Sequence, residues 1–93
     1  MSRKVVHVIG TGTIGEPLIG LLCDFKVDLG IDEVTFHKNS PLTTDRSKVV
    51  SLNNRGARLS TNESKFAGFN NIGLKPEFTT EEAIKRASVV IDC

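Results

Sequence analysis

Three glycines spaced as G-x-G-x-x-G follow an apolar run and carry the strongest chemical signal in this sequence. The run at residues 5–9 suits a strand buried in a parallel sheet, and a helical pattern follows the glycines. Gly10 would permit a tight turn, Gly12 would let the backbone approach a pyrophosphate, and Gly15 would let the helix pack against the strand. The N-terminus of that helix would offer N–H groups to the phosphates.

This context favours a dinucleotide-binding loop over a Gly-rich turn of purely structural use. The predicted cofactor contacts of the loop are Gly10, Thr11, Gly12, Thr13, Ile14 and Gly15. Glu16 follows the last glycine, and an acid suits the first turn of a helix but would repel a neighbouring pyrophosphate. The direction of the Glu16 side chain therefore decides whether it weakens the site.

The end of the second predicted strand indicates which dinucleotide would bind. NAD-binding folds usually carry an acid there, which bonds the ribose 2′-hydroxyl and would repel a 2′-phosphate. This sequence instead has Lys38, Asn39 and Ser40, a cation and two donors that suit a 2′-phosphate. Asp32 and Glu33 precede the strand and so belong to the opposite edge of the sheet. The predicted cofactor is NADP in preference to NAD, with a solvated surface lysine as the alternative interpretation of Lys38.

The hydrophobic pattern predicts an α/β domain over residues 1–93, with strands at 4–9, 33–37, 57–60 and 89–93. Helices are expected from near Thr13, over 43–54, over 63–71 and over 80–87, the last with a capping box of Thr79 and Glu82. This alternation predicts a Rossmann-like open parallel sheet of about four strands, in the order 3-2-1-4, with flanking helices. The residues of the first helix expected to face the sheet are Ile14, Leu18, Leu21, Leu22 and Phe25.

Composition narrows the classes of function. The chain has 93 residues and a formal net charge of +1, without the basic patch expected of a nucleic-acid binder. The first apolar stretch is too short for a signal peptide or a membrane span, so a cytoplasmic location is expected. The sequence stops on an apolar strand that would need a covering helix, which favours the N-terminal part of a longer protein.

Neither cysteine nor histidine predicts a catalytic or metal site. Cys23 and Cys93 lie far apart without metal-ligand spacing, and a cysteine ending an apolar strand is expected to be structural. His7 is expected inside the sheet, and His37 is expected to be a strand-end residue more than a phosphate ligand. No catalytic residue is therefore assigned within the chain.

Together these segments resemble the archaeal type of phosphorylating glyceraldehyde-3-phosphate dehydrogenase. The similar segments are Gly12-Thr13-Ile14-Gly15, Lys38-Asn39-Ser40-Pro41, Arg55-Gly56, Lys65-Phe66 and the closing stretch from Ala87 to Cys93. Ile9 and Thr11 depart from the residues usual around the first glycine, and Glu16-Pro17 replaces a basic pair.

The resemblance implies the NAD(P)-binding part of an aldehyde-oxidising enzyme that converts glyceraldehyde 3-phosphate and phosphate to 1,3-bisphosphoglycerate. It implies a nucleophilic cysteine downstream of Cys93 and a homo-oligomeric full-length protein. Three alternatives stay open: the N-terminal domain of an aspartate-semialdehyde or aspartate dehydrogenase, a stand-alone dinucleotide-binding or sensing module, and a scaffold in which Glu16 has abolished binding.

Overall fold

The computed structural model describes residues 4–10, 15–39 and 43–92 of the chain. The strands are β1 (Val5–Ile9), β2 (Glu33–His37), β3 (Arg58–Thr61), β4 (Phe78–Thr79) and β5 (Val89–Asp92). The helices are α1 (Gly15–Asp24), α2 (Arg46–Asn54), α3 (Phe66–Asn71) and α4 (Thr80–Arg86). Short 3₁₀ turns at Thr43–Asp45 and Glu63–Lys65 lead into α2 and α3, so the predicted helices 43–54 and 63–71 each begin as a 3₁₀ turn.

All strand pairs are parallel, and the described residues form one five-stranded sheet in the order β4-β3-β2-β1-β5. The predicted order 3-2-1-4 is wrong because it lacks β4, a two-residue strand that pairs with β3 at the edge. The sequence predicts no strand at Phe78 and Thr79, and it gives Thr79 only the role of N-cap of the following helix. Two residues are too few for a period-two pattern to identify a strand.

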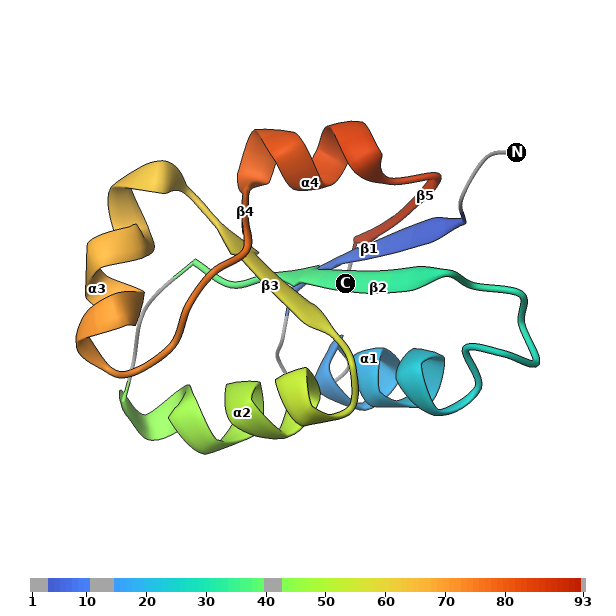
Figure 1. Cartoon of the computed structure of the whole chain (residues 1–93), viewed down its shortest axis with the longest axis horizontal. Helices are drawn as coiled ribbons and strands as arrows, with labels where there is room; N and C mark the ends of the chain where they lie inside the picture. The colour runs from blue at the N-terminus through green and yellow to red at the C-terminus, as the bar shows by residue number, and fades with distance from the viewer. Residues whose placement is uncertain (1–3, 11–14, 40–42, 93) are drawn as a thin grey trace.

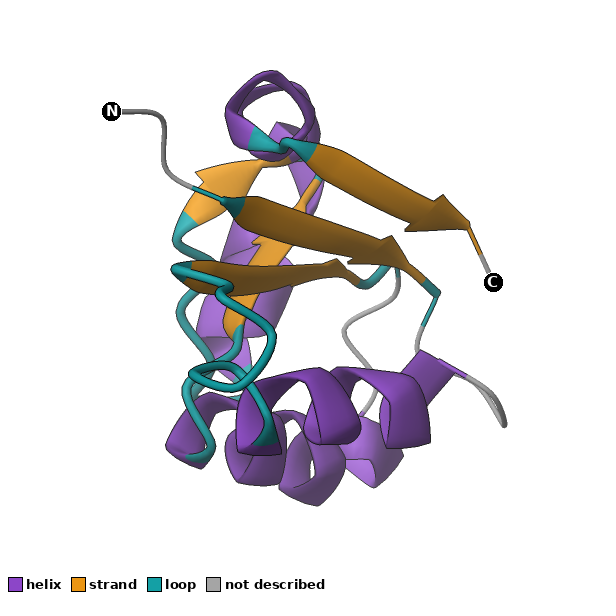
Figure 2. Ribbon diagram, turned by 90° about the vertical axis from the view of Figure 1, so that its right-hand side faces the viewer, coloured by secondary structure: helices purple, strands orange, loops and turns teal. Residues whose placement is uncertain are grey.

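The helices cover the sheet on both sides, which gives three layers. Figure 1 shows α1 and α2 on one side of the sheet and α4 on the other, and the side view in Figure 2 shows the same order. The face towards α1 and α2 is apolar and holds the core. Its largest fully buried members are Phe36, Phe69, Ile19 and Leu59.

Leu18 and Leu22 of the first helix face the core as expected, whereas Leu21 and Phe25 do not. Ile14 lies outside the described residues. Ile19 and Leu22 are buried and Leu18 packs against the core, whereas Leu21 is 53% exposed and Phe25 is 47% exposed. Apolar residues occur on several sides of this helix, so their spacing fits more than one face. In addition, α1 ends at Asp24, which places Phe25 in the following turn rather than on the helix.

Arg55, which directly follows α2, connects this part of the chain to α1. Its guanidinium donates to the carbonyl oxygen of Gly20 at 3.0 Å and pairs with the carboxylate of Asp24. A Cβ on Gly20 would collide with this guanidinium. The glycine inside α1 therefore lets Arg55 reach the helix backbone, although glycine is a poor helix former.

The fifth strand has little cover. Among the described residues β5 pairs with β1 alone, and Val89 and Val90 are 42% and 45% exposed. Neither face of this strand is therefore buried like those of the central strands β1 and β2.

Candidate functional site

The parallel sheet brings the ends of β1, β2, β3 and β5 to one edge. From β1 the chain proceeds through β2 and β3 to β4 on one side, whereas β5 adds on the other side of β1. In open α/β sheets, ligands bind outside the carboxyl ends of the strands where the order reverses in this way. The candidate site is therefore the carboxyl edge around β1, with Ile9 paired to His37 on one side and to Asp92 on the other.

The glycine loop begins and ends at positions that suit its predicted role. Gly10 directly follows β1 and has a φ of 106°, in the left-handed region that favours glycine. Gly15 is the first residue of α1. Thr11, Gly12, Thr13 and Ile14 lie outside the described residues, as does the expected helix start near Thr13. Their contacts to a cofactor stay predictions.

Glu16 is directed towards α2. Its carboxylate Oε2 lies 3.7 Å from the ammonium Nζ of Lys48, and the Glu16 side chain is about a third exposed. The ion pair places a positive charge beside the acid and joins the start of α1 to α2. This arrangement offsets part of the repulsion that Glu16 would exert on a phosphate.

The second predicted contact segment lies at the end of β2. The backbone N–H of Lys38 donates to the carbonyl oxygen of Ser60 at 3.1 Å, which continues the pairing with β3 one residue past β2. Lys38 is half-buried and Asn39 is exposed, and both lie at the same edge as Gly10. Ser40 lies outside the described residues.

A polar cluster beside this segment was not predicted as part of the site. The Thr80 hydroxyl donates to Oδ1 of Asn62 at 2.7 Å and lies 3.4 Å from Nδ1 of His37. These residues come from the start of α4, the turn after β3 and the end of β2. They are far apart in sequence, and the only local signal is that each is a polar residue at the end of a strand or directly after it.

Burial and hydrogen bonding act on His37 in opposite directions. Burial lowers the pKa of the His37 imidazole below its ordinary value, and a side-chain hydrogen bond with Asn39 acts to raise it. The neutral ring can therefore donate one hydrogen bond and accept another at the edge where the cofactor is predicted.

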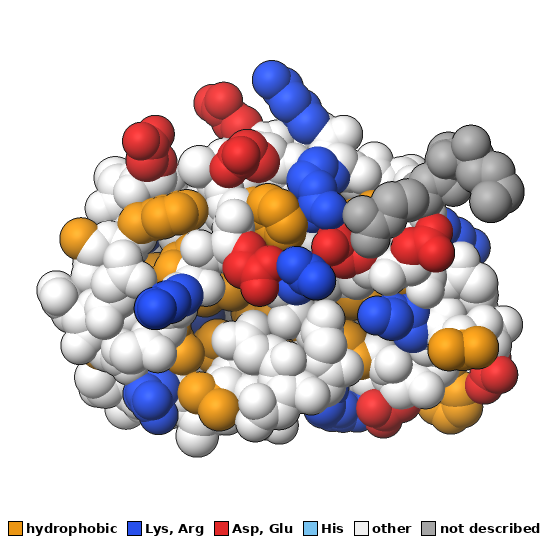
Figure 3. Space-filling view, in the orientation of Figure 1, with side chains coloured by type: hydrophobic (Ala, Val, Ile, Leu, Met, Phe, Trp, Pro, Cys, Tyr) orange, Lys and Arg blue, Asp and Glu red, His pale blue; other side chains and the backbone are white. Residues whose placement is uncertain are grey.

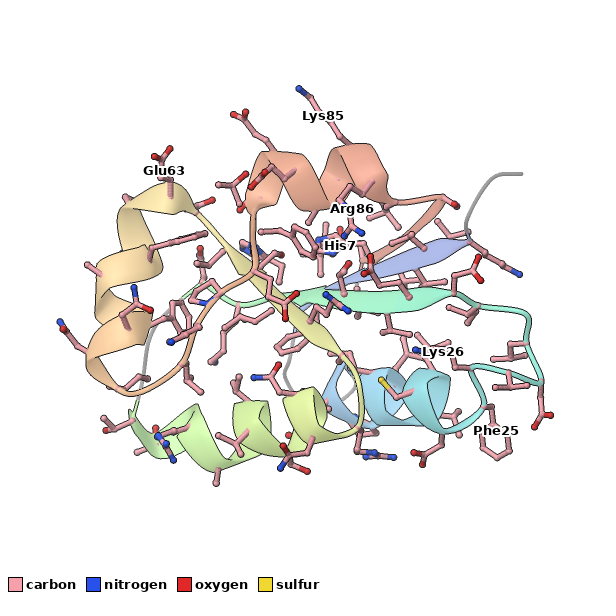
Figure 4. All side chains as sticks on the ribbon, viewed as in Figure 1. His7, Phe25, Lys26, Glu63, Lys85 and Arg86 are labelled. Carbon is pink, nitrogen blue, oxygen red and sulfur yellow. The ribbon has the colours of Figure 1, made fainter. Side chains whose placement is uncertain are left out.

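The sheet face beneath α4 is polar, unlike the face beneath α1 and α2. His7 on β1 is fully buried, and its Nδ1 lies 2.7 Å from the hydroxyl of Thr35 on β2. Burial lowers the pKa of His7, and the neighbouring His37 lowers it further. This outcome agrees with the expected position of His7 inside the sheet. Figure 4 shows His7 and Arg86 between the sheet and α4.

The two acids expected at the opposite edge are there. Asp32 accepts a hydrogen bond from the backbone N–H of Lys4 at 2.7 Å. Glu33, the first residue of β2, is 4% exposed and pairs with Nε of Arg58 at 3.2 Å and Nη2 of Arg86 at 2.6 Å. Both carboxylates are thus engaged at the amino ends of the strands, away from the candidate site.

The cysteines offer no activated nucleophile among the described residues. Cys23 is half-buried against the core, and this burial raises the pKa of its thiol, which disfavours the reactive thiolate. Cys93 lies outside the described residues. Within the described part of the chain, no group of three His, Cys, Asp or Glu residues is placed to hold a metal ion.

The described residues line two open hollows, one of which borders Asn62 and Thr80 of the polar cluster. One of about 310 Å³ borders the carboxyl edge, but its lining includes Glu63 and Glu81, whose charge does not suit a phosphate. The other, of about 470 Å³, lies between the end of α2 and residues 73–77, at the amino end of β3. Neither hollow has the place and charge expected for a dinucleotide.

The rest of the surface has no single sign of charge on the side in view. Figure 3 shows lysine, arginine and acidic side chains interspersed over this face. No helix in the described ranges is long and apolar enough to cross a membrane.

Comparisons with protein-family models, with curated proteins and with solved structures found no match. The resemblance to a phosphorylating dehydrogenase therefore rests on the sequence segments alone. What the structure adds is the α/β fold with a parallel sheet, Rossmann-like in its general form, and the placement of Gly10 and of Lys38-Asn39 at one edge of that sheet.

Proposed function

We propose that the chain binds a dinucleotide, NADP in preference to NAD, at the carboxyl edge of its sheet. The observation that supports this most is the pairing of β1 with β2. It brings Gly10, which has a positive φ, and the Lys38-Asn39 segment to the same edge, at the point where the strand order reverses. The pyrophosphate would lie at the start of α1.

Lys38 would contact the 2′-phosphate that distinguishes NADP from NAD. Asn39 would add a hydrogen-bond donor, and Ser40 would add a second one. The paired Glu16 would not prevent binding, since Lys48 lies beside its carboxylate. The third alternative, a scaffold without binding, therefore has less support than a site that binds.

The wider proposal follows the resemblance. The chain would be the cofactor-binding part of a cytoplasmic dehydrogenase that oxidises an aldehyde phosphate, and the full-length protein would be a homo-oligomer. Hydride would pass to the nicotinamide from an adduct formed on a cysteine outside this chain. Sequencing the gene past the codon for Cys93 tests this part, because a reading frame without a downstream cysteine-containing active-site segment would contradict it.

Calorimetry of the purified chain with NADP and with NAD tests the binding proposal. We expect saturable binding of both, with NADP tighter. Lys38→Ala should lose about ten- to a hundredfold in NADP affinity, because a hydrogen bond to a charged group contributes about 1.5–3 kcal/mol. NAD affinity should change little.

Lys85→Ala is the matched control for the loss of one positive charge. Lys85 is exposed on α4 and points away from the body of the protein (Figure 4). It should leave both affinities unchanged. Equal losses for NADP and NAD in Lys38→Ala would contradict the 2′-phosphate role, and absence of binding in the unaltered chain would contradict the proposed function.

A further inference from the structure

Three polar side chains from separate elements form a hydrogen-bonded chain next to the proposed ribose site. Thr80 at the start of α4 donates to Asn62, which follows β3, and faces Nδ1 of His37 at the end of β2. Asn62 precedes a 3₁₀ turn, yet within the described residues its side chain makes no capping bond there. The side-chain amide oxygen Oδ1 of Asn62 accepts from the Thr80 hydroxyl instead.

The single proton of the Thr80 hydroxyl bears on which nitrogen of the His37 ring carries a proton. That proton goes to Oδ1 of Asn62, so the Thr80 oxygen can only accept from His37. This favours the tautomer of the neutral ring that carries its proton on Nδ1 and leaves Nε2 as an acceptor. Asn62 thereby selects the tautomer of His37 through Thr80.

His37 in turn borders the residues proposed to recognise the ribose. It directly precedes Lys38, and its ring forms a side-chain hydrogen bond with Asn39. A ring fixed in orientation and tautomer holds the Asn39 side chain in one arrangement. The affinity for NADP depends on donors held in place around its 2′-phosphate. The affinity for NAD, which has only a 2′-hydroxyl there, depends less on these donors.

We propose that Thr80 and Asn62 are positioning residues that act through His37 to favour NADP over NAD. The inference rests on the proposed dinucleotide function and adds residues that lie outside the glycine loop and outside Lys38-Asn39-Ser40.

The test compares NADP and NAD affinities, by calorimetry, in Thr80→Val and Thr80→Ser. Valine keeps the shape of threonine and removes the hydroxyl, and serine keeps the hydroxyl. We expect Thr80→Val to weaken NADP binding by about three- to tenfold, the effect of one neutral hydrogen bond, and NAD binding by less than about twofold. Thr80→Ser should bind NADP with the affinity of the unaltered chain.

A second readout examines the ring itself. The ¹⁵N chemical shifts of the His37 ring should report a proton on Nδ1 in the unaltered chain and a mixed tautomer in Thr80→Val. Asn62→Ala changes an exposed residue outside the helix and should produce the same two effects. It therefore tests the proposal even where Thr80→Val does not fold. Ser51→Ala, which removes an exposed hydroxyl on α2, should produce neither.

The outcomes separate the inference from the function beneath it. If the unaltered chain binds NADP more tightly than NAD and both Thr80→Val and Asn62→Ala keep that preference, the positioning role is wrong and the proposed function stands. If the unaltered chain binds neither dinucleotide, the proposed function fails and the inference falls with it.

Discussion

At the scale of single residues, buried charge is concentrated under α4. Glu33 is almost completely buried, and its two carboxylate oxygens lie against the guanidinium groups of Arg58 and Arg86. Arg58 also pairs with Glu77 at 2.7 Å, and Arg86 lies 4.0 Å from the centre of the Phe78 ring. One buried acid therefore links β2, β3 and α4.

Two glutamates share Arg58, and Glu33 differs from Glu77 in its burial and in its second ion pair with Arg86, which makes the two variants a useful comparison. We expect Glu33→Gln to lower the free energy of unfolding by about 1–3 kcal/mol, because it leaves two cations without their buried partner. Glu77→Gln should cost less than about 1 kcal/mol, since the Glu77 side chain is 47% exposed and its ion pair is screened by water. Urea unfolding of both variants measures the difference. Equal losses would show that burial does not govern the contribution of these ion pairs.

At the scale of elements, α4 depends on its first turn. The Thr79 hydroxyl accepts from the backbone N–H of Glu82 at 3.1 Å, and the Glu82 carboxylate accepts from the backbone N–H of Thr79 at 2.9 Å. This is the capping box that the sequence predicts at these two residues. Because β4 ends at Thr79 and α4 begins at Thr80, the cap also fixes the corner between strand and helix.

We expect Thr79→Ala to lower the free energy of unfolding by about 1 kcal/mol, the usual cost of losing a side-chain N-cap. The position of Thr80 depends on the same corner, so amide exchange should also become faster at the start of α4. Urea unfolding and hydrogen exchange measure the two effects. Thr79→Ser keeps the capping oxygen and is the control, and a serine variant as unstable as the alanine variant would contradict the capping role.

At the scale of the whole molecule, the two histidines make stability depend on pH. Burial lowers the pKa of both His7 and His37 below the ordinary value of 6.5. The unfolded chain therefore takes up protons at a higher pH than the folded chain does. Stability should be constant above the unfolded value, fall as the pH drops through about 6.5, and level off below the lowered values.

Unfolding by urea at about pH 7.5 and about pH 5.5 measures this loss in a window where ordinary carboxylates stay ionised. The pKa of the Glu82 carboxyl is lowered by its hydrogen bonds to Thr79, so the stability that this group adds is lost only at more acid pH. His7→Gln should flatten the profile, and the double variant with His37→Gln should flatten it further. A double variant with the full pH dependence would rule out the histidines as its source.

The sequence alone determined the parts of this protein that depend on neighbours along the chain. The apolar runs predicted β1 and β2, the capping box predicted the start of α4, and the alternation of strands and helices predicted a parallel sheet with helices on it. In parallel strands, residues that follow the strand ends share one edge, and so the sequence predicts that Gly10 and Lys38 lie near each other.

Tertiary structure decided what depends on residues distant in sequence. It added β4, a strand too short to have a pattern, and it turned Ile19 rather than Leu21 and Phe25 towards the core. It paired Glu16 with Lys48, and it joined His37, Asn62 and Thr80 beside the proposed site. Each of these outcomes is a contact between elements, and the pattern of a single element does not specify which of its faces meets which neighbour.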